Sequence, residues 1–66
     1  MNGEEVRKMS QEELTEELAR LRRHLYDLRS QAVTEKLEDP TQLGKTKRDI
    51  ARLLTEQRAR QLAARA

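Results

Sequence analysis

The basic residues of this chain are spaced so that rows of them would fall on single faces of helices. Lys45, Arg48 and Arg52 follow an i, i+3, i+7 pattern, which at roughly 100° per residue places them on one helical face, nearly opposite Ile50 and Leu54. A second set recurs every seven residues, namely Arg22, Arg29 and Lys36. Cations in such rows suit successive phosphates of a nucleic-acid backbone. The spacing therefore predicts a surface that binds a polyanion.

The alternative is a coiled-coil flank, in which the same cations pair with acidic side chains. Residues 1–19 carry six acidic and two basic side chains, whereas residues 20–66 carry six acidic and twelve basic ones. From residue 40 onward, seven basic side chains have only Asp49 and Glu56 as acidic partners. This shortage of acids favours the polyanion surface, although composition alone leaves both interpretations open.

Groups suited to catalysis or metal binding are scarce. His24 is the only histidine, and it falls just off the apolar face beside Arg20 and Arg23, which is typical of a surface imidazole. The sequence holds no Ser–His–Asp set, paired-carboxylate cleft or glycine-rich phosphate loop. The acids near the first helix start are better explained by the helix dipole than by a metal. We expect no enzyme, catalytic residue, metal, cofactor or small-molecule substrate.

Length and composition narrow the class further. The chain has 66 residues, 39% of them charged, and no cysteine, which excludes a disulfide scaffold and fits a reducing compartment. The opening MNGEEVRK contains no apolar run, so we expect no secretory signal. No stretch approaches eighteen consecutive apolar residues, so we expect no membrane span.

A long helix must position the first basic row. Its narrow apolar seam consists of leucines at alternating spacings of four and three, continued by Ala32: Leu14, Leu18, Leu21, Leu25 and Leu28. Ser10 followed by Glu13 is a capping-box pattern that marks the helix start. The pattern predicts a helix over about residues 11–36, preceded by a short helical turn within residues 4–9.

A second helix is predicted over about residues 40–63, after a turn at about 37–39. Asp39 is suited to the N-cap and Pro40 to the first helical position, and Gln42 completes a second capping-box pattern. The apolar face is expected to contain Leu43, Ile50, Leu53 and Leu54. We place three of these with the five seam leucines in the hairpin core, namely Leu43, Ile50 and Leu54.

So short a connection between long helices forces an antiparallel arrangement. The predicted fold is all-α, a single domain over residues 1–66 that forms a long antiparallel two-helix hairpin with a short N-terminal helical turn. A chain of this size gains little stability from its own core, so we expect a larger partner. Two functions fit: a structural RNA-binding protein, or a helical-hairpin or coiled-coil module that binds another protein.

Two runs, LRRHLYDLRSQAVTEKLEDP and KTKRDIARLLT, resemble the family of the large-subunit ribosomal protein numbered twenty-nine in the universal scheme. The likeness covers about residues 4–60 and is most specific in LYDLRSQA and DIARLLT. It implies a helical hairpin bound to 23S rRNA near the polypeptide exit tunnel, in cytoplasmic ribosomes. The implied neighbours are the large-subunit ribosomal protein numbered twenty-three and nascent-chain factors that dock near the tunnel exit.

The resemblance also implies particular RNA contacts. Matching the family's motifs by position points to Arg29 and Gln31 in the first helix and to Lys47, Arg48 and Arg52 in the second. Combined with the basic rows, the candidate RNA-binding residues are Arg22, Arg29, Gln31, Lys45, Lys47, Arg48 and Arg52.

The chain departs from the family pattern at three positions. Tyr26 stands where phenylalanine is usual, Glu35 where glycine is common and Gly44 where arginine is common. The glutamate implies that the first helix continues without a glycine break. The glycine removes one implied RNA contact, for which Lys45 is a substitute.

Overall fold

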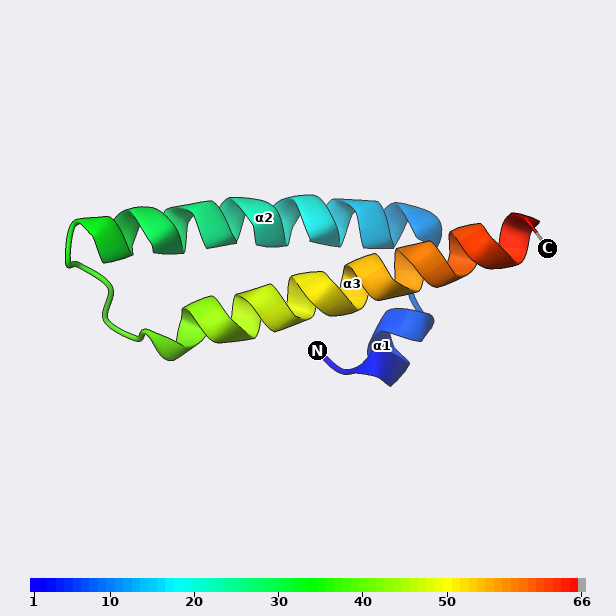
Figure 1. Cartoon of the computed structure of the whole chain (residues 1–66), viewed down its shortest axis with the longest axis horizontal. Coiled ribbons are helices and arrows are strands. Elements are labelled where there is room, and N and C mark those ends of the chain that lie inside the picture. The colour runs from blue at the N-terminus through cyan, green and yellow to red at the C-terminus, as the bar shows by residue number, and fades with distance from the viewer. Residues whose placement is uncertain (66) are drawn as a thin grey trace.

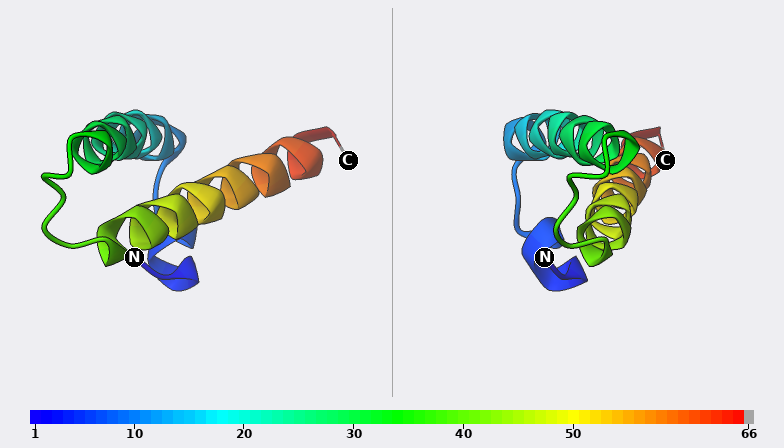
Figure 2. Two further views of the ribbon diagram at one scale, coloured as in Figure 1. Left: turned by 60° about the vertical axis from the view of Figure 1, so that its left-hand side comes forward. Right: turned by 90° about the vertical axis from the view of Figure 1, so that its left-hand side faces the viewer.

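The computed structural model describes residues 1–65 and contains three α-helices: α1 (Gly3–Arg7), α2 (Gln11–Val33) and α3 (Thr41–Arg65). Helices α2 and α3 lie side by side and antiparallel, which gives an elongated molecule of 47 × 17 × 16 Å (Figure 1). Helix α1 packs beside α3 beneath the N-terminal half of α2, so three helices meet at one end (Figure 2). The predicted all-α hairpin with a short N-terminal helix is confirmed.

Polar side chains fix the starts of the first two helices. The Asn2 side chain accepts a hydrogen bond from the Glu5 amide at 2.8 Å. The Ser10 hydroxyl oxygen accepts one from the Glu13 amide at 3.1 Å, as its capping pattern predicts. Each bond satisfies an amide that has no partner inside its helix.

Asp39 holds the start of α3. One carboxylate oxygen accepts hydrogen bonds from the Thr41 hydroxyl at 2.6 Å and the Thr41 amide at 3.0 Å. The other accepts a bond from the Gln42 side-chain amide at 3.4 Å. The capping role of Asp39 is confirmed, but the regular helix begins at Thr41 rather than Pro40. Gln42 also contacts the carboxylate, not the Asp39 amide that a capping box would use.

Helix α2 ends at Val33, three residues before the predicted end. Glu35 adopts a φ of 60°, the left-handed conformation that usually favours glycine. Its amide donates to the Ala32 carbonyl at 3.2 Å, and the Lys36 amide donates to the Gln31 carbonyl at 2.9 Å. These two bonds form a Schellman ending. The interpretation that Glu35 lets the helix continue is wrong, because the glutamate takes the conformation of the missing glycine.

The core lies where the three helices meet. Its buried members are Val6, Leu14, Leu18, Leu21 and Leu53, with Met1, Met9 and Ile50 packed against them. Leu28 is buried nearer the turn, and Leu25, Leu43 and Ile50 are half-buried.

The predicted core is wrong at Leu54, whose side chain is 40% exposed, whereas Leu53 is fully buried. The reason is rotational, since neighbouring residues on a helix point roughly 100° apart. Thr46 is buried one heptad before Leu53, so these two mark the centre of the buried face. That face is therefore less apolar than the leucine pattern suggested.

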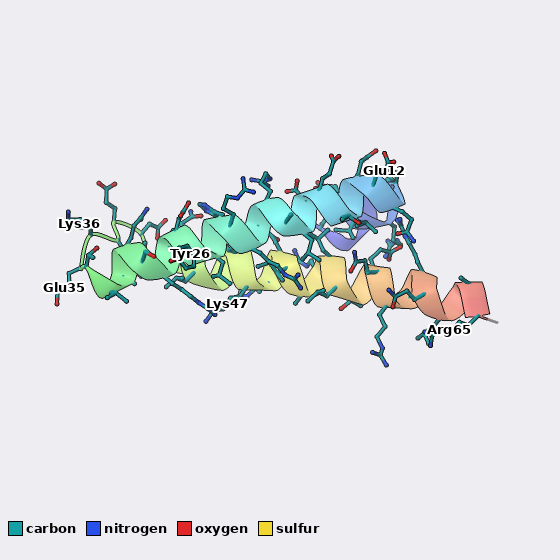
Figure 3. All side chains as sticks on the ribbon, turned by 90° about the horizontal axis from the view of Figure 1, so that it is seen from above. Glu12, Tyr26, Glu35, Lys36, Lys47 and Arg65 are labelled. Atoms are coloured by element: carbon teal, nitrogen blue, oxygen red, sulfur yellow. The ribbon has the colours of Figure 1, made fainter. Side chains whose placement is uncertain are left out.

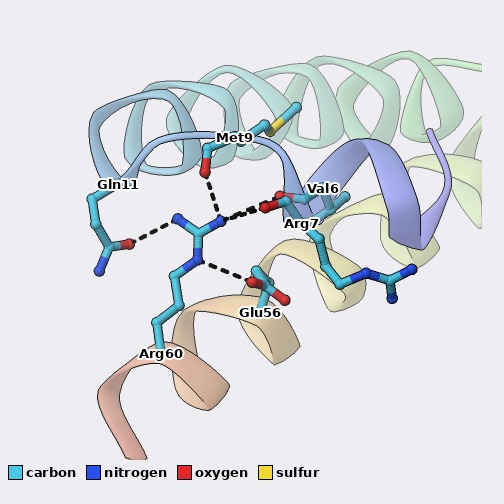
Figure 4. A network of polar contacts seen from close by, with 6 residues as sticks. All are labelled: Val6, Arg7, Met9, Gln11, Glu56 and Arg60. Atoms are coloured by element: carbon cyan, nitrogen blue, oxygen red, sulfur yellow. Dashed lines mark hydrogen bonds and ion pairs between the residues drawn. The ribbon is translucent and has the colours of Figure 1, made fainter. Parts of the chain in front are cut away.

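Arg60 of α3 fastens α1 to the hairpin (Figure 4). Its guanidinium partners are the carbonyl oxygens of Val6, Arg7 and Met9 and the side chains of Gln11 and Glu56. The shortest of these bonds joins Nη2 to the Met9 carbonyl at 2.6 Å. One side chain thus supplies donors to the Arg7 and Met9 carbonyls, at and just after the end of α1, and a second donor to the Val6 carbonyl, which also accepts from the Met9 amide. Nearby, Arg52 donates to the Met1 carbonyl, which gives a second anchor.

Candidate nucleic-acid interface

Helix α1 divides the surface of the hairpin into two sides. Arg60 of α3 contacts α1, Arg52 donates to the Met1 carbonyl just before α1, and Arg20 of α2 lies near Asp49 of α3. These residues define the side that carries α1, which we call the α1 side. The opposite long face is the open side. Figure 3 shows Lys47 on the open side, pointing away from α1.

All seven candidate RNA-binding side chains are exposed, but they do not form one patch. Helical geometry places Arg22 and Arg29 on the open side with Lys47. The α1 side carries Lys45, Arg48 and Arg52, and Gln31 lies near the turn.

On the open side, α2 presents a continuous row at i, i+4, i+7 and i+11, consisting of Arg22, Tyr26, Arg29 and Val33. We call it the Tyr26 row. Tyr26 is 71% exposed and Val33 is 84% exposed, so neither packs into the hairpin. Across from this row, Lys47 of α3 lies at the same level as Tyr26 (Figure 3).

On the α1 side, the expected stripe of Lys45, Arg48 and Arg52 does follow one flank of α3. It was expected to lie nearly opposite the apolar face. Because Leu53 rather than Leu54 points into the core, the stripe lies only about a third of a turn from the buried face. Arg52 also has partners within the chain. It donates a hydrogen bond to the Met1 carbonyl, and its Nη1 lies 3.8 Å from an Asp49 carboxylate oxygen.

The basic row predicted on the first helix, which consists of Arg22, Arg29 and Lys36, is also shorter than its spacing predicted. Lys36 was expected to continue the heptad spacing of Arg22 and Arg29, but it lies beyond the end of α2. It lines an open hollow of about 530 Å³ at the hairpin turn, together with Leu28, Gln31, Leu37, Glu38, Asp39 and Gln42. Charges of both signs line this hollow, so it has no clear preference for an anion.

Ion pairing leaves most of the candidate cations without a counter-charge. Within residues 1–65 the ion pairs are Lys8–Glu4, Arg20–Glu17, Arg52–Asp49 and Arg60–Glu56. The hydrogen bond from Arg20 lowers the pKa of the Glu17 carboxyl, with a smaller contribution from the Arg20 charge. Of the candidate RNA-binding cations, only Arg52 forms an ion pair with another of the described residues.

Other kinds of site have little support. In the described part of the chain, no group of three or more His, Cys, Asp or Glu side chains is placed to hold a metal ion. His24 is exposed, as its position beside the seam suggested. Across residues 1–65, every helix falls short of the length and apolar character that crossing a bilayer requires.

Sequence reasoning missed two features that organise this surface. Arg60 gave no signal, because its partners are mostly carbonyls about fifty residues away. The Tyr26 row is visible in the sequence as an i, i+4, i+7 spacing, but a pattern built from cations alone does not include its aromatic member. The structure therefore defines a small helical scaffold with basic edges.

Known proteins place this scaffold in a family. Residues 4–60 match the family model described as Ribosomal L29 protein, so the chain belongs to the ribosomal L29 protein family. It is therefore a structural constituent of the large ribosomal subunit rather than an enzyme. That membership associates it with ribosomes in the cytoplasm.

The chain is similar to curated relatives over most of their length, and each of these relatives carries the name "Large ribosomal subunit protein uL29". The protein of Gemmatimonas aurantiaca is 46% identical over 98% of this chain and 97% of its own. That of Nitratidesulfovibrio vulgaris is 49% identical over 83% and 90%. That of Gloeothece citriformis is 45% identical over 91% and 79%. No solved structure matches the chain.

Proposed function

We propose that the chain binds 23S rRNA near the polypeptide exit tunnel through cations on both sides of the hairpin. The observation that carries the proposal is a set of exposed cations, on both sides of the hairpin, that form no ion pair within residues 1–65. Arg22, Arg29 and Lys47 lie on the open side, and Lys45 and Arg48 lie on the α1 side. Family membership supplies the ribosomal setting.

Phosphate binding is the chemistry that this arrangement favours. The groove of an RNA duplex that carries most base information is too deep and narrow for side chains. A rigid rod with cations along two edges is suited instead to RNA strands on either side of it, held by their phosphates. We expect recognition of shape and backbone rather than of sequence at these edges.

The interaction-module alternative has less support, because the leucine seam is used inside the molecule. Leu14, Leu18 and Leu21 are buried against Leu53 and Val6, so the seam is not available to a helix of another protein. A protein neighbour would have to use the outer surface. In our proposal that neighbour is the large-subunit protein numbered twenty-three, with nascent-chain factors docking close by.

Three double variants, each removing two positive charges, test the RNA contacts. They are Arg22→Gln with Arg29→Gln, Lys45→Gln with Arg48→Gln, and, as a matched control, Arg7→Gln with Arg65→Gln. The affinity of the full chain for 23S rRNA is measured at several salt concentrations. Removing one cation from a phosphate should flatten the slope of log affinity against log salt by about one unit. We expect a decrease of about one to two units for the first two variants.

The control separates position from net charge. Arg7 and Arg65 are exposed, and neither forms an ion pair within residues 1–65. Their variant should keep the parental slope. If all three variants flatten it equally, only net charge attracts the RNA, and the edges have no special role. If none does, the cations merely face solvent and the proposal fails.

The location is tested separately by crosslinking within assembled large subunits. The chain has no cysteine, so Ser30→Cys on the exposed outer surface of α2 gives a single attachment point for a short photo-crosslinker. We expect adducts to 23S rRNA near the tunnel exit or to the protein numbered twenty-three. Adducts confined to RNA remote from the tunnel would contradict this location.

A further inference from the structure

Tyr26 is the only aromatic residue of the chain, yet it lies outside the core at 71% exposure. A 66-residue hairpin is short of apolar surface to bury, and its largest apolar side chain would ordinarily help to fill the interior. Here leucines and Val6 fill the core instead. Single exposed apolar residues are common and need no explanation, so the surroundings of Tyr26 must carry the argument.

Those surroundings are cationic along the helix. Arg22 and Arg29 occupy the i−4 and i+3 positions relative to Tyr26, and side chains at these spacings are direct neighbours on a helix. Neither arginine forms an ion pair within the described chain. Lys47 of α3 lies at the same level on the open side (Figure 3). Positive charges therefore lie on both sides of the Tyr26 ring, and they are available to bind an anion.

We propose that Tyr26 stacks on an unpaired base of the ribosomal RNA, while Arg22 and Arg29 hold phosphates on either side of that nucleotide. This inference rests on the proposed function and assigns one base-contacting residue within it. Proteins read unpaired RNA nucleotides mainly by stacking them on aromatic rings. The two arginines are about 10 Å apart along the helix axis, which leaves room for a nucleotide between them.

Charge favours RNA over a protein as the occupant of this row. A protein neighbour would have to supply both an apolar contact for Tyr26 and acidic groups for three cations. An RNA strand supplies phosphates and stacking faces in every nucleotide. The side chain of Tyr26 is 71% exposed, so most of the ring is accessible to such a strand.

The test compares Tyr26→Leu and Tyr26→Phe for binding of the full chain to 23S rRNA at low and high salt. Stacking needs the ring but not the hydroxyl, and the ring carries no charge. We expect Tyr26→Leu to weaken binding about ten-fold at both salt concentrations, and Tyr26→Phe to keep the parental affinity within about two-fold. Leu62→Ala, which removes another exposed apolar side chain, is the matched control and should bind normally.

A second readout uses the same residue. Because the chain contains no tryptophan, its intrinsic fluorescence comes from Tyr26 alone, and stacking on a base should quench it when 23S rRNA is added. Binding without quenching overturns the stacking proposal.

The variants distinguish this failure from a failure of the proposed function. If Tyr26→Leu binds like the parent while Arg22→Gln with Arg29→Gln loses its salt slope, RNA binding stands and stacking is overturned. If Tyr26→Phe is as weak as Tyr26→Leu, the hydroxyl rather than the ring makes the contact, which also overturns stacking. A loss seen only in assembled subunits assigns Tyr26 to a protein neighbour and overturns it too. If the parent chain itself fails to bind, the proposed function is wrong, and the stacking proposal fails with it.

Discussion

At position 53 a leucine is fully enclosed where the three helices meet, while the next leucine along the chain is turned toward solvent. The sequence offers two registers for the face of α3 that packs on α2. One uses Leu43, Ile50 and Leu54 and is the more apolar. The observed register centres on Thr46 and Leu53, and a count of leucines could not have chosen it. Arg60, whose hydrogen bonds attach α1 to the hairpin, belongs to the same register.

We expect Leu53→Ala to lower the free energy of unfolding by about 2–5 kcal/mol, because it opens a cavity in a small core. Leu54→Ala should cost less than about 1 kcal/mol, since much of that side chain already contacts water. Urea unfolding followed by circular dichroism measures both. Equal costs at the two positions would mean that α3 is rotated relative to the structure described.

Arg60 is the residue on which docking of α1 depends most. Arg60→Ala removes the side-chain donor of the Arg7 and Met9 carbonyls, at and just after the end of α1, which should cost about 1–3 kcal/mol. Hydrogen exchange should show weaker protection of the Val6 and Met9 amides, whose bonds lie in and just after α1, while the middle of α2 stays protected. Arg60→Lys keeps the charge but not the planar fork, so it should rescue docking only partly. Unchanged protection of the Val6 amide in Arg60→Ala would show that Arg60 does not hold α1 against the hairpin.

At the scale of the elements, the helix starts were readable in the sequence and one helix end was not. Ser10 and Asp39 cap as their types predict, because an N-cap depends on a single local side chain. The end of α2 depends on a backbone conformation that glutamate rarely adopts. A sequence without glycine there therefore gave the wrong boundary.

Glu35→Gly should stabilise the chain by about 1 kcal/mol, because glycine adopts the positive φ without the steric cost that a side chain incurs. Glu35→Ala removes the same charge but keeps a Cβ, so it should bring no comparable gain. Thermal unfolding of both variants decides the matter. A destabilised Glu35→Gly variant would show that the residue is not held in the left-handed conformation.

The Asp39 cap should make the stability of α3 depend on pH. The Thr41 hydroxyl is the largest cause that lowers the pKa of Asp39 below its ordinary value of 3.8, followed by the Thr41 amide and Gln42. A lowered folded-state pKa means that the charged cap stabilises above the unfolded value, and that this contribution is lost as pH falls through the folded value. Melting temperatures should therefore fall below about pH 4.

Asp39→Ser is the matched variant, because serine caps a helix without titrating. Its melting temperature should lie closer to that of the parent at acid pH than at neutral pH. An advantage of the parent that stays constant across this range would show that the Asp39 carboxylate does not cap α3.

At the scale of the whole molecule, the hairpin is a narrow rod whose main core lies at the end where the three helices meet, with Leu28 buried nearer the turn. The all-α class and the antiparallel arrangement follow from seam, caps and short connection, and these were predictable. The division of the basic residues between two sides was not, because it depends on which face of α3 packs against α2. Two basic edges on one rod fit a scaffold that lies between RNA segments.

RNA binding by the two basic edges is tested most directly by sedimentation of the chain with large ribosomal subunits that lack their own copy, over a range of salt concentrations. We expect the parent chain to co-sediment and to dissociate only at high salt. A variant with Arg22, Arg29, Lys45 and Arg48 changed to Gln should dissociate at clearly lower salt, because fewer condensed counterions are released on binding. Retention of that variant at every salt concentration at which the parent is retained would contradict the claim that these two edges bind ribosomal RNA.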